Sequence, residues 1–296
     1  MVAQAPTNDV DTGTEGKDVA FTFVQALAAE LSGGKVELPG FPHIVMQVQR
    51  VLGDESADAT RIVRVIGGEP VLAAQLVRMA NSVALNPGRT PVTDLKAAVA
   101  RVGLDTVRTA TIAFAIQQLR DAPALKGVER QLGILWRHSV QIAALSFAVA
   151  RRLTTVNSDS AMLAGLLQGI GRLYILTRAS RHRALFADPL TYQTIEHDWH
   201  LSIAAALLEN WGMADEIVQA VHESENLERE TRGAPCLADV LVVATLLADL
   251  HGEPTVLQAQ TQCAKPLQRL RLDYAACDAF LKESANEIAA LREALG

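Results

Sequence analysis

The sequence predicts an all-α protein, a bundle of many helices with a helical subdomain at its N-terminal end. Hydrophobic residues make up 49% of the 296 residues and aromatic residues only 4%. The core must therefore consist mainly of Ala, Leu, Val and Ile, a mixture that suits closely packed helices. Apolar residues recur at helical spacing, as at Ile142, Leu145, Val149 and Leu153. The alternating pattern that indicates strands is almost absent.

The first segments are expected to be a leader and a short helix. Residues 1–18 are rich in Thr, Asp, Gly, Gln and Ala and carry no apolar period, which predicts a disordered leader. The N-terminal helix expected within 19–34 covers Phe21 to Leu31, and Ser32-Gly33-Gly34 closes it because glycine readily takes the left-handed conformation that ends helices. Further helices are expected over His43–Leu52, Asp58–Ile66, Pro70–Asn81, Asp94–Val102 and Thr106–Leu119.

Short turns separate these helices. The step Gly67-Gly68-Glu69-Pro70 combines a helix end with proline in the first turn of the next helix. Thr93 follows Pro91 and is predicted to cap the next helix through its side-chain oxygen. Asn81 and Ser82 are predicted to end the helix before them and to fix the loop toward Pro91, with a ligand contact as the alternative.

The second half of the chain continues in the same way. A long helix is expected from about Val128, and a main domain over 35–230 is followed by a C-terminal helical extension over 231–296 that packs on it. Trp211 closes an apolar stripe with Ile203 and Leu207, so core packing is its expected role and a partner contact the alternative. The other helices are expected over Ser158–Leu167, Gly171–Arg178, Trp199–Trp211, Ala214–His222, Ala234–Leu250 and Ala276–Leu295.

Charge and composition argue against several classes of partner. Acidic residues outnumber basic ones by 33 to 27, and the net charge of −6 would repel nucleic acid, which is not expected as a partner. The basic stretches Arg151-Arg152 and Arg178 to Arg183 lie near helix ends and complement the helix dipole there, with phosphate binding as the alternative.

Cysteine spacing and hydropathy point to the cytoplasm. Cys236, Cys263 and Cys277 fit neither a disulfide framework nor a zinc site. The most apolar stretch, Val240 to Ala248, is too short to cross a bilayer, so no membrane segment is expected. A basic region followed by an apolar one, as in secretory signals, is not apparent at the N-terminus.

Short motifs occur in a definite order along the chain. They are Leu38-Pro39-Gly40-Phe41-Pro42, Arg78-Met79-Ala80-Asn81-Ser82, Pro91-Val92-Thr93-Asp94-Leu95, Val102-Gly103-Leu104-Asp105, Leu135-Trp136-Arg137-His138-Ser139, Ala164-Gly165-Leu166-Leu167, Ile170-Gly171-Arg172-Leu173 and Leu207-Leu208-Glu209-Asn210-Trp211-Gly212. In order and spacing these motifs resemble the HD-related output domain (HDOD) family over about Val36 to Leu227. The resemblance implies an HD-like helical bundle with family-motif positions at Arg78, Asn81, Ser82, Pro91, Thr93, Gly103 and Trp211.

The wider HD superfamily is associated with metal-dependent phosphohydrolases whose ligands are a His, a His-Asp pair and a later Asp. Here His138 matches the first position, Gln168 and Gly169 stand in place of the pair, and Thr245 stands in place of the later Asp. Gln is a weak neutral ligand and Gly has no side chain, so a hard cation would lack charge and ligands. The resemblance thus implies a degenerate site with no catalytic residue, no bound metal and no cofactor.

Other chemistry finds little support in the sequence. His197 and His200 are spaced three apart and could approach a common metal from one helix face. Asp198 between them stands where a helix is expected to begin, however, and N-capping explains it without a metal. His138 is likewise explained as a helix histidine with a hydrogen-bond partner. Signatures of a phosphate loop, a nucleophile elbow or a nucleophilic cysteine are missing.

The function expected from the resemblance is regulatory. Such domains are linked to bacterial signalling, including networks that use cyclic dinucleotides, and act by binding other proteins rather than by catalysis. The identity of the signalling partners and the oligomeric state are not readable from the sequence. Two alternatives stay open: a nucleotide or small-ligand sensor in which Gly169 leaves room and Arg172 holds phosphate, and a residual metal-dependent phosphohydrolase that uses His138, His197 and His200.

Overall fold

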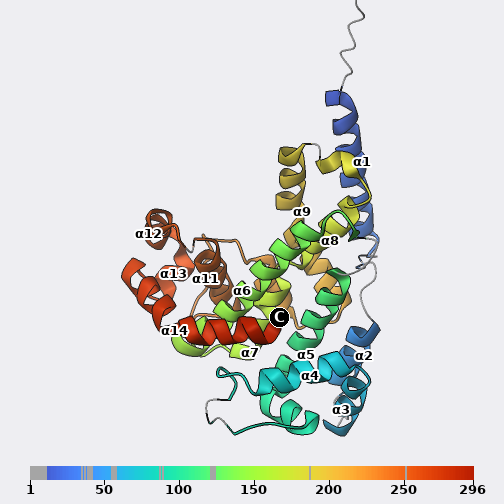
Figure 1. The fold of residues 1–296 in the computed structure, drawn as a ribbon. Coiled ribbons are helices and arrows are strands. Elements are labelled where there is room, and N and C mark those ends of the chain that lie inside the picture. The colour runs from blue at the N-terminus through green and yellow to red at the C-terminus, as the bar shows by residue number, and fades with distance from the viewer. Residues whose placement is uncertain are drawn as a thin grey trace, which may run out of the picture.

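The computed structural model describes residues 12–34, 36, 38, 43–54, 59–86, 88, 90–120, 125–186, 188–250 and 252–296. Within these residues the chain forms helices and no strand, which confirms the predicted all-α fold (Figure 1). The elements are α1 (Thr12–Ser32), α2 (His43–Leu52), α3 (Ala59–Gly67), α4 (Pro70–Ala80), α5 (Leu95–Arg120), α6 (Glu129–Leu153), α7 (Ser158–Leu167), α8 (Ile170–Ala179), the 3-10 helix η2 (Arg183–Phe186), α9 (Pro189–Asn210), α10 (Asp215–His222), α11 (Leu237–Asp249), α12 (Pro254–Cys263), α13 (Lys265–Arg269) and α14 (Tyr274–Leu295).

Helices α2, α3 and α4 pack on one another and on α5, and they form a group at one end of the molecule (Figure 1). The backbone of α5 is broken at Gly103, whose φ of 80° and ψ of 169° are not helical. Glycine tolerates this positive φ because it has no Cβ. The two separate helices predicted over 94–102 and 106–119 are therefore the two segments on either side of this kink.

Helix α6 is the central helix of the bundle. It packs against α7, α11, α14 and α8, and most of its second half is fully buried. Helices α6 and α7 lie so close together that a Cβ on Gly165 of α7 would be only 2.7 Å from the Cα of Ala143 on α6. Among the described residues, α6 is the one helix whose length and hydropathy would allow it to cross a membrane, and 67% of its most apolar window is buried in the bundle. A central core helix meets the same criterion, and the expectation that no segment spans a membrane stays a prediction.

The helical boundaries differ from the predicted ones at two N-termini. Helix α1 begins at Thr12, so residues 12–18 are helical, whereas the sequence predicts a leader there; residues 1–11 lie outside the described part. Helix α9 begins at Pro189, about three turns before the predicted start at Trp199. Asp188 caps it by accepting from the amides of Leu190 and Thr191, and Asp198 lies inside the helix. The proposed capping role of Asp198 is therefore wrong.

The cap of α5 is also shifted by one residue. The side chain of Asp94 accepts a hydrogen bond of 2.8 Å from the amide of Ala97, three residues on, as an N-cap does. Thr93 is exposed and lies one residue too early for this role. Aspartate is at least as good a cap as threonine, and the two adjacent candidates were indistinguishable by composition alone.

The C-terminal third belongs to the same core. Helix α11 packs on α6, α7 and α10, and α14 packs on α6 and α4. The end of α14 lies in the middle of the molecule (Figure 1), where the carbonyl of Leu295 accepts from Gln75 of α4 at 3.0 Å and from Gln117 of α5 at 2.9 Å. The short helices α12 and α13 were not predicted. Helices α11 and α14 thus pack on the preceding helices, and α11 completes their core.

Candidate functional site

The four positions of the degenerate site lie on helices that pack together. His138 is on α6, Gln168 ends α7, Gly169 precedes α8, and Thr245 is on α11. These helices contact one another around α6. Tertiary packing therefore brings the four positions into one region, although their side chains contact different groups.

Gln168 is fully buried, and neither its amide nitrogen nor its amide oxygen has a hydrogen-bond partner among the described residues. Gly169 lies against α6: a Cβ there would lie 2.6 Å from Oγ of Ser139 and 3.3 Å from Cδ1 of Leu135. The hydroxyl of Ser139 therefore occupies part of the space that a side chain at this position would need. Gly169 and Ser139 also line a small cavity of about 20 Å³. The expectation that Gly169 leaves room for a ligand stays a prediction.

The carboxylate that faces His138 belongs to Asp249, not to the position of Thr245. Nε2 of His138 lies 3.3 Å from Oδ1 of Asp249 at the end of α11. Thr245 is 5% exposed, and its hydroxyl has no partner among the described residues. Asp249 stands four residues after Thr245, one turn along the same face of the helix. That spacing was the signal from which the sequence could have suggested Asp249.

Burial shifts the titration of this pair toward its neutral forms. Desolvation lowers the pKa of His138, although the charge of Asp249 works in the opposite direction. Desolvation also raises the pKa of Asp249, although His138 and Arg172 work against this shift. At pH 7 the imidazole of His138 is consequently neutral and offers hydrogen bonding rather than positive charge.

A second group lies where α8, α9 and the segment after α10 meet. Nη2 of Arg172 lies 2.6 Å from Oε1 of Glu225 and 3.3 Å from Nε2 of His200. Nε2 of the fully buried His200 is also 3.4 Å from Oε2 of Glu225. The hydrogen bond with His200, followed by the positive charge of Arg172, lowers the pKa of Glu225 to about 2.

The histidines expected as metal candidates are partly brought together. His197, His200 and Glu225 each offer a ligand atom within 4.8 Å of the others, whereas His138 belongs to the group with Asp249. The guanidinium of Arg172 already contacts two of the three ligands, and its charge would oppose a metal ion there. Around His138, Asp249 is the single carboxylate in contact among the described residues. Neither donor set fits the metal of an HD phosphohydrolase.

Both groups border an open cavity of about 600 Å³ between α6, α8, α9 and α11. Its charged and titratable lining residues include His138, Arg172, Glu196 and Asp249. Burial raises the pKa of Glu196, and the positive charge of Arg172 opposes this shift. The rest of the lining is amide, aliphatic or aromatic, from Gln131, Ile134, Leu135, Leu176, Phe186, Pro189, Tyr192 and Gln193.

The family-motif positions lie away from this cavity. The Asn81 amide donates to the carbonyls of Val77 and Val92 at 3.0 and 2.7 Å, and its oxygen accepts from the amide of Val92 at 2.8 Å. These bonds join the end of α4 to the loop before α5, the structural role predicted for Asn81. Gly103 forms the kink, Trp211 packs half-buried at the end of α9, and the hydroxyl of Ser82 is buried. Arg78, Pro91 and Thr93 are exposed.

The helical architecture is that of proteins with an HD-like fold. The sequence matches the HDOD domain over residues 38–227, and the chain belongs to this family. A curated protein of Treponema pallidum (strain Nichols) is 22% identical over 244 residues, which are 77% of this chain. The chain spans only 45% of the length of that relative.

Solved structures show the same fold. A candidate metal-dependent phosphohydrolase of Shewanella amazonensis SB2B has a TM-score of 0.76 and 21% identity, over 94% of this chain and 100% of the other. An HDOD domain protein of Geobacter sulfurreducens has a TM-score of 0.60 and 21% identity, and the match covers 97% of this chain and 99% of the other. A candidate signal transduction protein of Marinobacter aquaeolei VT8 has a TM-score of 0.59 and 21% identity, and the match covers 97% of this chain and 67% of the other.

Proposed function

We propose that this chain is a non-catalytic signalling module that acts by binding other proteins. The observation that carries the proposal is the pair Gln168 and Gly169: the first is a buried amide and the second has part of its side-chain space occupied by Ser139. A site with one imidazole and one facing carboxylate lacks the ligands that hold a catalytic metal. Membership of the HDOD family supports the signalling role, and so does the resemblance in fold to the Marinobacter signal transduction protein.

Residual phosphohydrolase activity is the enzymatic alternative. It would need His197, His200 and Glu225 to hold a metal while Arg172 remains bonded to Glu225. The positive charge of Arg172 would weaken that metal, and we favour the non-catalytic function for this reason.

The catalytic part is tested by loading the purified chain with Mn²⁺, Zn²⁺ or Fe²⁺ and assaying p-nitrophenyl phosphate and a cyclic dinucleotide. We expect no stoichiometric metal and no turnover above that of His138→Ala. The double variant Gln168→His with Gly169→Asp should be equally inactive, because the introduced carboxylate would have to displace Ser139 and the surrounding hydrogen bonds are not arranged for a metal. Turnover that disappears in His138→Ala would overturn the proposal.

The binding part is tested by affinity capture from the native cell extract. Partner retention should be unchanged in His138→Ala and should fall in a panel of exposed-residue variants across the first half of the chain. The panel begins with Val71 and Val83, whose side chains are 65% and 63% exposed. Each variant must keep the melting temperature of the wild type. Failure of the wild type to retain any protein would count against this function.

A further inference from the structure

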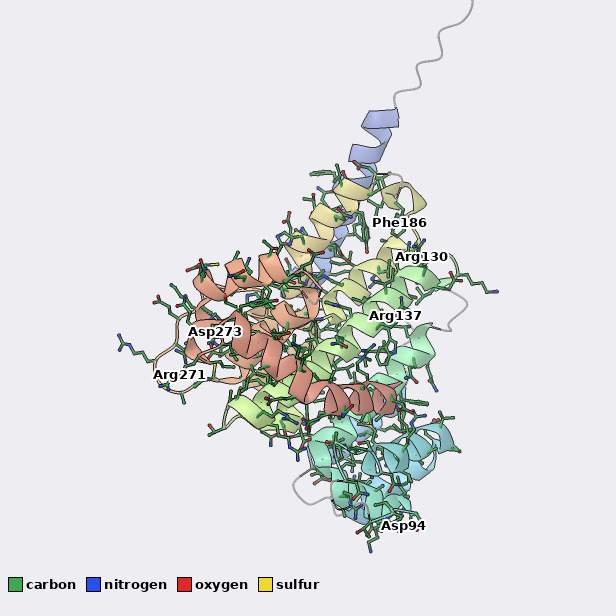
Figure 2. The ribbon with its side chains drawn as sticks, turned by 60° about the vertical axis from the view of Figure 1, so that its left-hand side comes forward. Asp94, Arg130, Arg137, Phe186, Arg271 and Asp273 are labelled. Atoms are coloured by element: carbon green, nitrogen blue, oxygen red, sulfur yellow. The ribbon has the colours of Figure 1, made fainter. Side chains whose placement is uncertain are left out.

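The cavity beside His138 has one aromatic side. Phe186 of η2 and Tyr192 of α9 stand with ring centroids 5.1 Å apart and ring planes inclined by 40°. Figure 2 shows Phe186 next to the start of α6, where Arg130 is labelled, and Ile134 one turn further on is 51% exposed at the cavity edge. A flat apolar group in the cavity would therefore have aromatic rings and aliphatic side chains to contact.

The charges that line the cavity favour a positively charged ligand. Two carboxylates, Glu196 and Asp249, line the cavity together with a single guanidinium, that of Arg172. Arg172 is already bonded to Glu225 at 2.6 Å, so its charge is largely compensated. His138 adds no positive charge at neutral pH because burial lowers its pKa.

The two carboxylates, by contrast, lack a full counter-charge. Asp249 contacts only the neutral imidazole of His138 among the ion pairs of the described residues. Burial raises the pKa of Glu196 more than the positive charge of Arg172 lowers it. Carboxylates in such surroundings are stabilised by a cation that approaches them.

We propose that this cavity is a binding site for a small organic cation, an ammonium or amidinium attached to a flat aromatic body. The cation lies toward Asp249 and Glu196, and the body packs between Phe186 and the aliphatic wall at Leu176. Phosphate-bearing ligands are disfavoured, because a phosphate would face the two carboxylates while Arg172 remains bonded to Glu225. The volume of about 600 Å³ accommodates a molecule of one or two rings. The site extends beyond the proposed partner binding and does not depend on it.

Three probes with a common indole ring separate charge from shape: tryptamine is a cation, indole-3-acetamide is neutral and indole-3-acetate is an anion. Isothermal titration of the full chain at low ionic strength should show the highest affinity for tryptamine, a lower one for the amide and the lowest for the acetate. We expect the affinities for tryptamine and the acetate to differ at least about tenfold, since the interaction energies of like and unlike charges near a partly buried carboxylate differ by more than about 1.4 kcal/mol. Inorganic phosphate should bind more weakly than tryptamine.

Substitutions of lining residues test where tryptamine binds. Asp249→Asn and Glu196→Gln should each weaken the binding of tryptamine about fivefold or more. The affinity for the amide should stay within about twofold, because each substitution removes one charge and keeps the shape of the side chain. Glu209→Gln is the matched control, since Glu209 is an exposed glutamate on the same helix α9 and does not line the cavity. Phe186→Ala should weaken all three indoles alike. Melting temperatures confirm that the variants fold.

Three outcomes would overturn the proposal: no saturable binding of tryptamine at millimolar concentration, acetate or phosphate binding as tightly as tryptamine, or equal tryptamine affinity in Glu209→Gln and Asp249→Asn.

Discussion

Glu225 contacts two residues that belong to different helices, Arg172 and His200. Its two oxygens contact Arg172 and His200, and these contacts lower its pKa to about 2. The bonds join α8 and α9 to the segment after α10. The same contacts that stabilise the fold thus argue against the nearest candidate metal site.

These contacts predict a pH-dependent stability. A carboxyl group whose pKa is lower in the folded state than in the unfolded chain stabilises the protein at every pH above its pKa in the unfolded chain. For Glu225 that pKa is near 4.5, and the stabilisation disappears as the pH falls toward 2. We expect Glu225→Gln to lower the free energy of unfolding by about 1.5–3 kcal/mol at pH 7, the usual contribution of hydrogen bonds to a charged group. The difference from wild type should vanish near pH 2.

Urea unfolding of both proteins at pH 7, 5, 3.5 and 2.5 measures this difference. Glu209→Gln is the control, because Glu209 is exposed and its loss should change stability little at any pH. A difference for Glu225→Gln that is the same at every pH would show that the charge of Glu225 contributes nothing.

At the scale of elements, the backbones of α8 and α9 are in close contact. A Cβ on Gly171 would lie 1.8 Å from the carbonyl oxygen of His200, so α8 and α9 approach each other without any side chain between them. This contact holds Arg172 and His200 near one another. The sequence motif Ile170-Gly171-Arg172-Leu173 gave no sign that its glycine serves helix packing.

Gly171→Ala should therefore be strongly destabilising. The carbonyl belongs to the backbone, so α9 as a whole must shift, and we expect a cost of about 3 kcal/mol, the upper end for overpacked cores. Gly133→Ala on α6 is the matched control. Its Cβ would lie 3.4 Å from the end of the flexible Arg137 side chain, and alanine should stabilise the helix by about 0.5–1 kcal/mol.

Thermal and urea unfolding of the two variants give these values. Opposite signs for the two substitutions support the close approach of α8 and α9, whereas equal small effects would contradict it.

At the scale of the whole molecule, helix α14 packs on helices from both halves of the chain. Helix α14 buries large side chains, among them Phe280, Ile288, Leu291 and Leu295, against α6 and α4. Its final carbonyls also accept from Gln75, Gln117 and Trp136, which lie on three different helices. The end of the chain thus connects the N-terminal group of helices to the central bundle.

Truncation after Asp273 should consequently prevent stable folding. Each large apolar side chain contributes about 1.5–3 kcal/mol when buried, and the four together reach the roughly 5–15 kcal/mol that stabilises a typical domain. Circular dichroism should show no cooperative thermal transition in the truncated chain. The exposed substitutions Glu283→Ala and Asn286→Ala on α14 serve as the control and should leave the transition unchanged. A cooperative transition near the wild-type temperature would show that α14 is dispensable.

The sequence by itself determined the helical class, most helix positions and the replacement of the His-Asp pair by Gln168 and Gly169. These features are local, because spacing, caps and glycines act over a few residues. The errors at Thr93 and at the start of α9 were also local, since neighbouring Asp and Thr residues compete for the same capping role.

Only the tertiary structure decided what surrounds His138. Its contact with Asp249 joins residues of α6 and α11, and the contact of Arg172 with Glu225 joins α8 to the segment after α10. The position of Ser139 in part of the space at Gly169 and the aromatic side of the cavity also depend on how helices distant in sequence pack. Helix periodicity specifies which face of each helix is buried, but not which face of which other helix covers it.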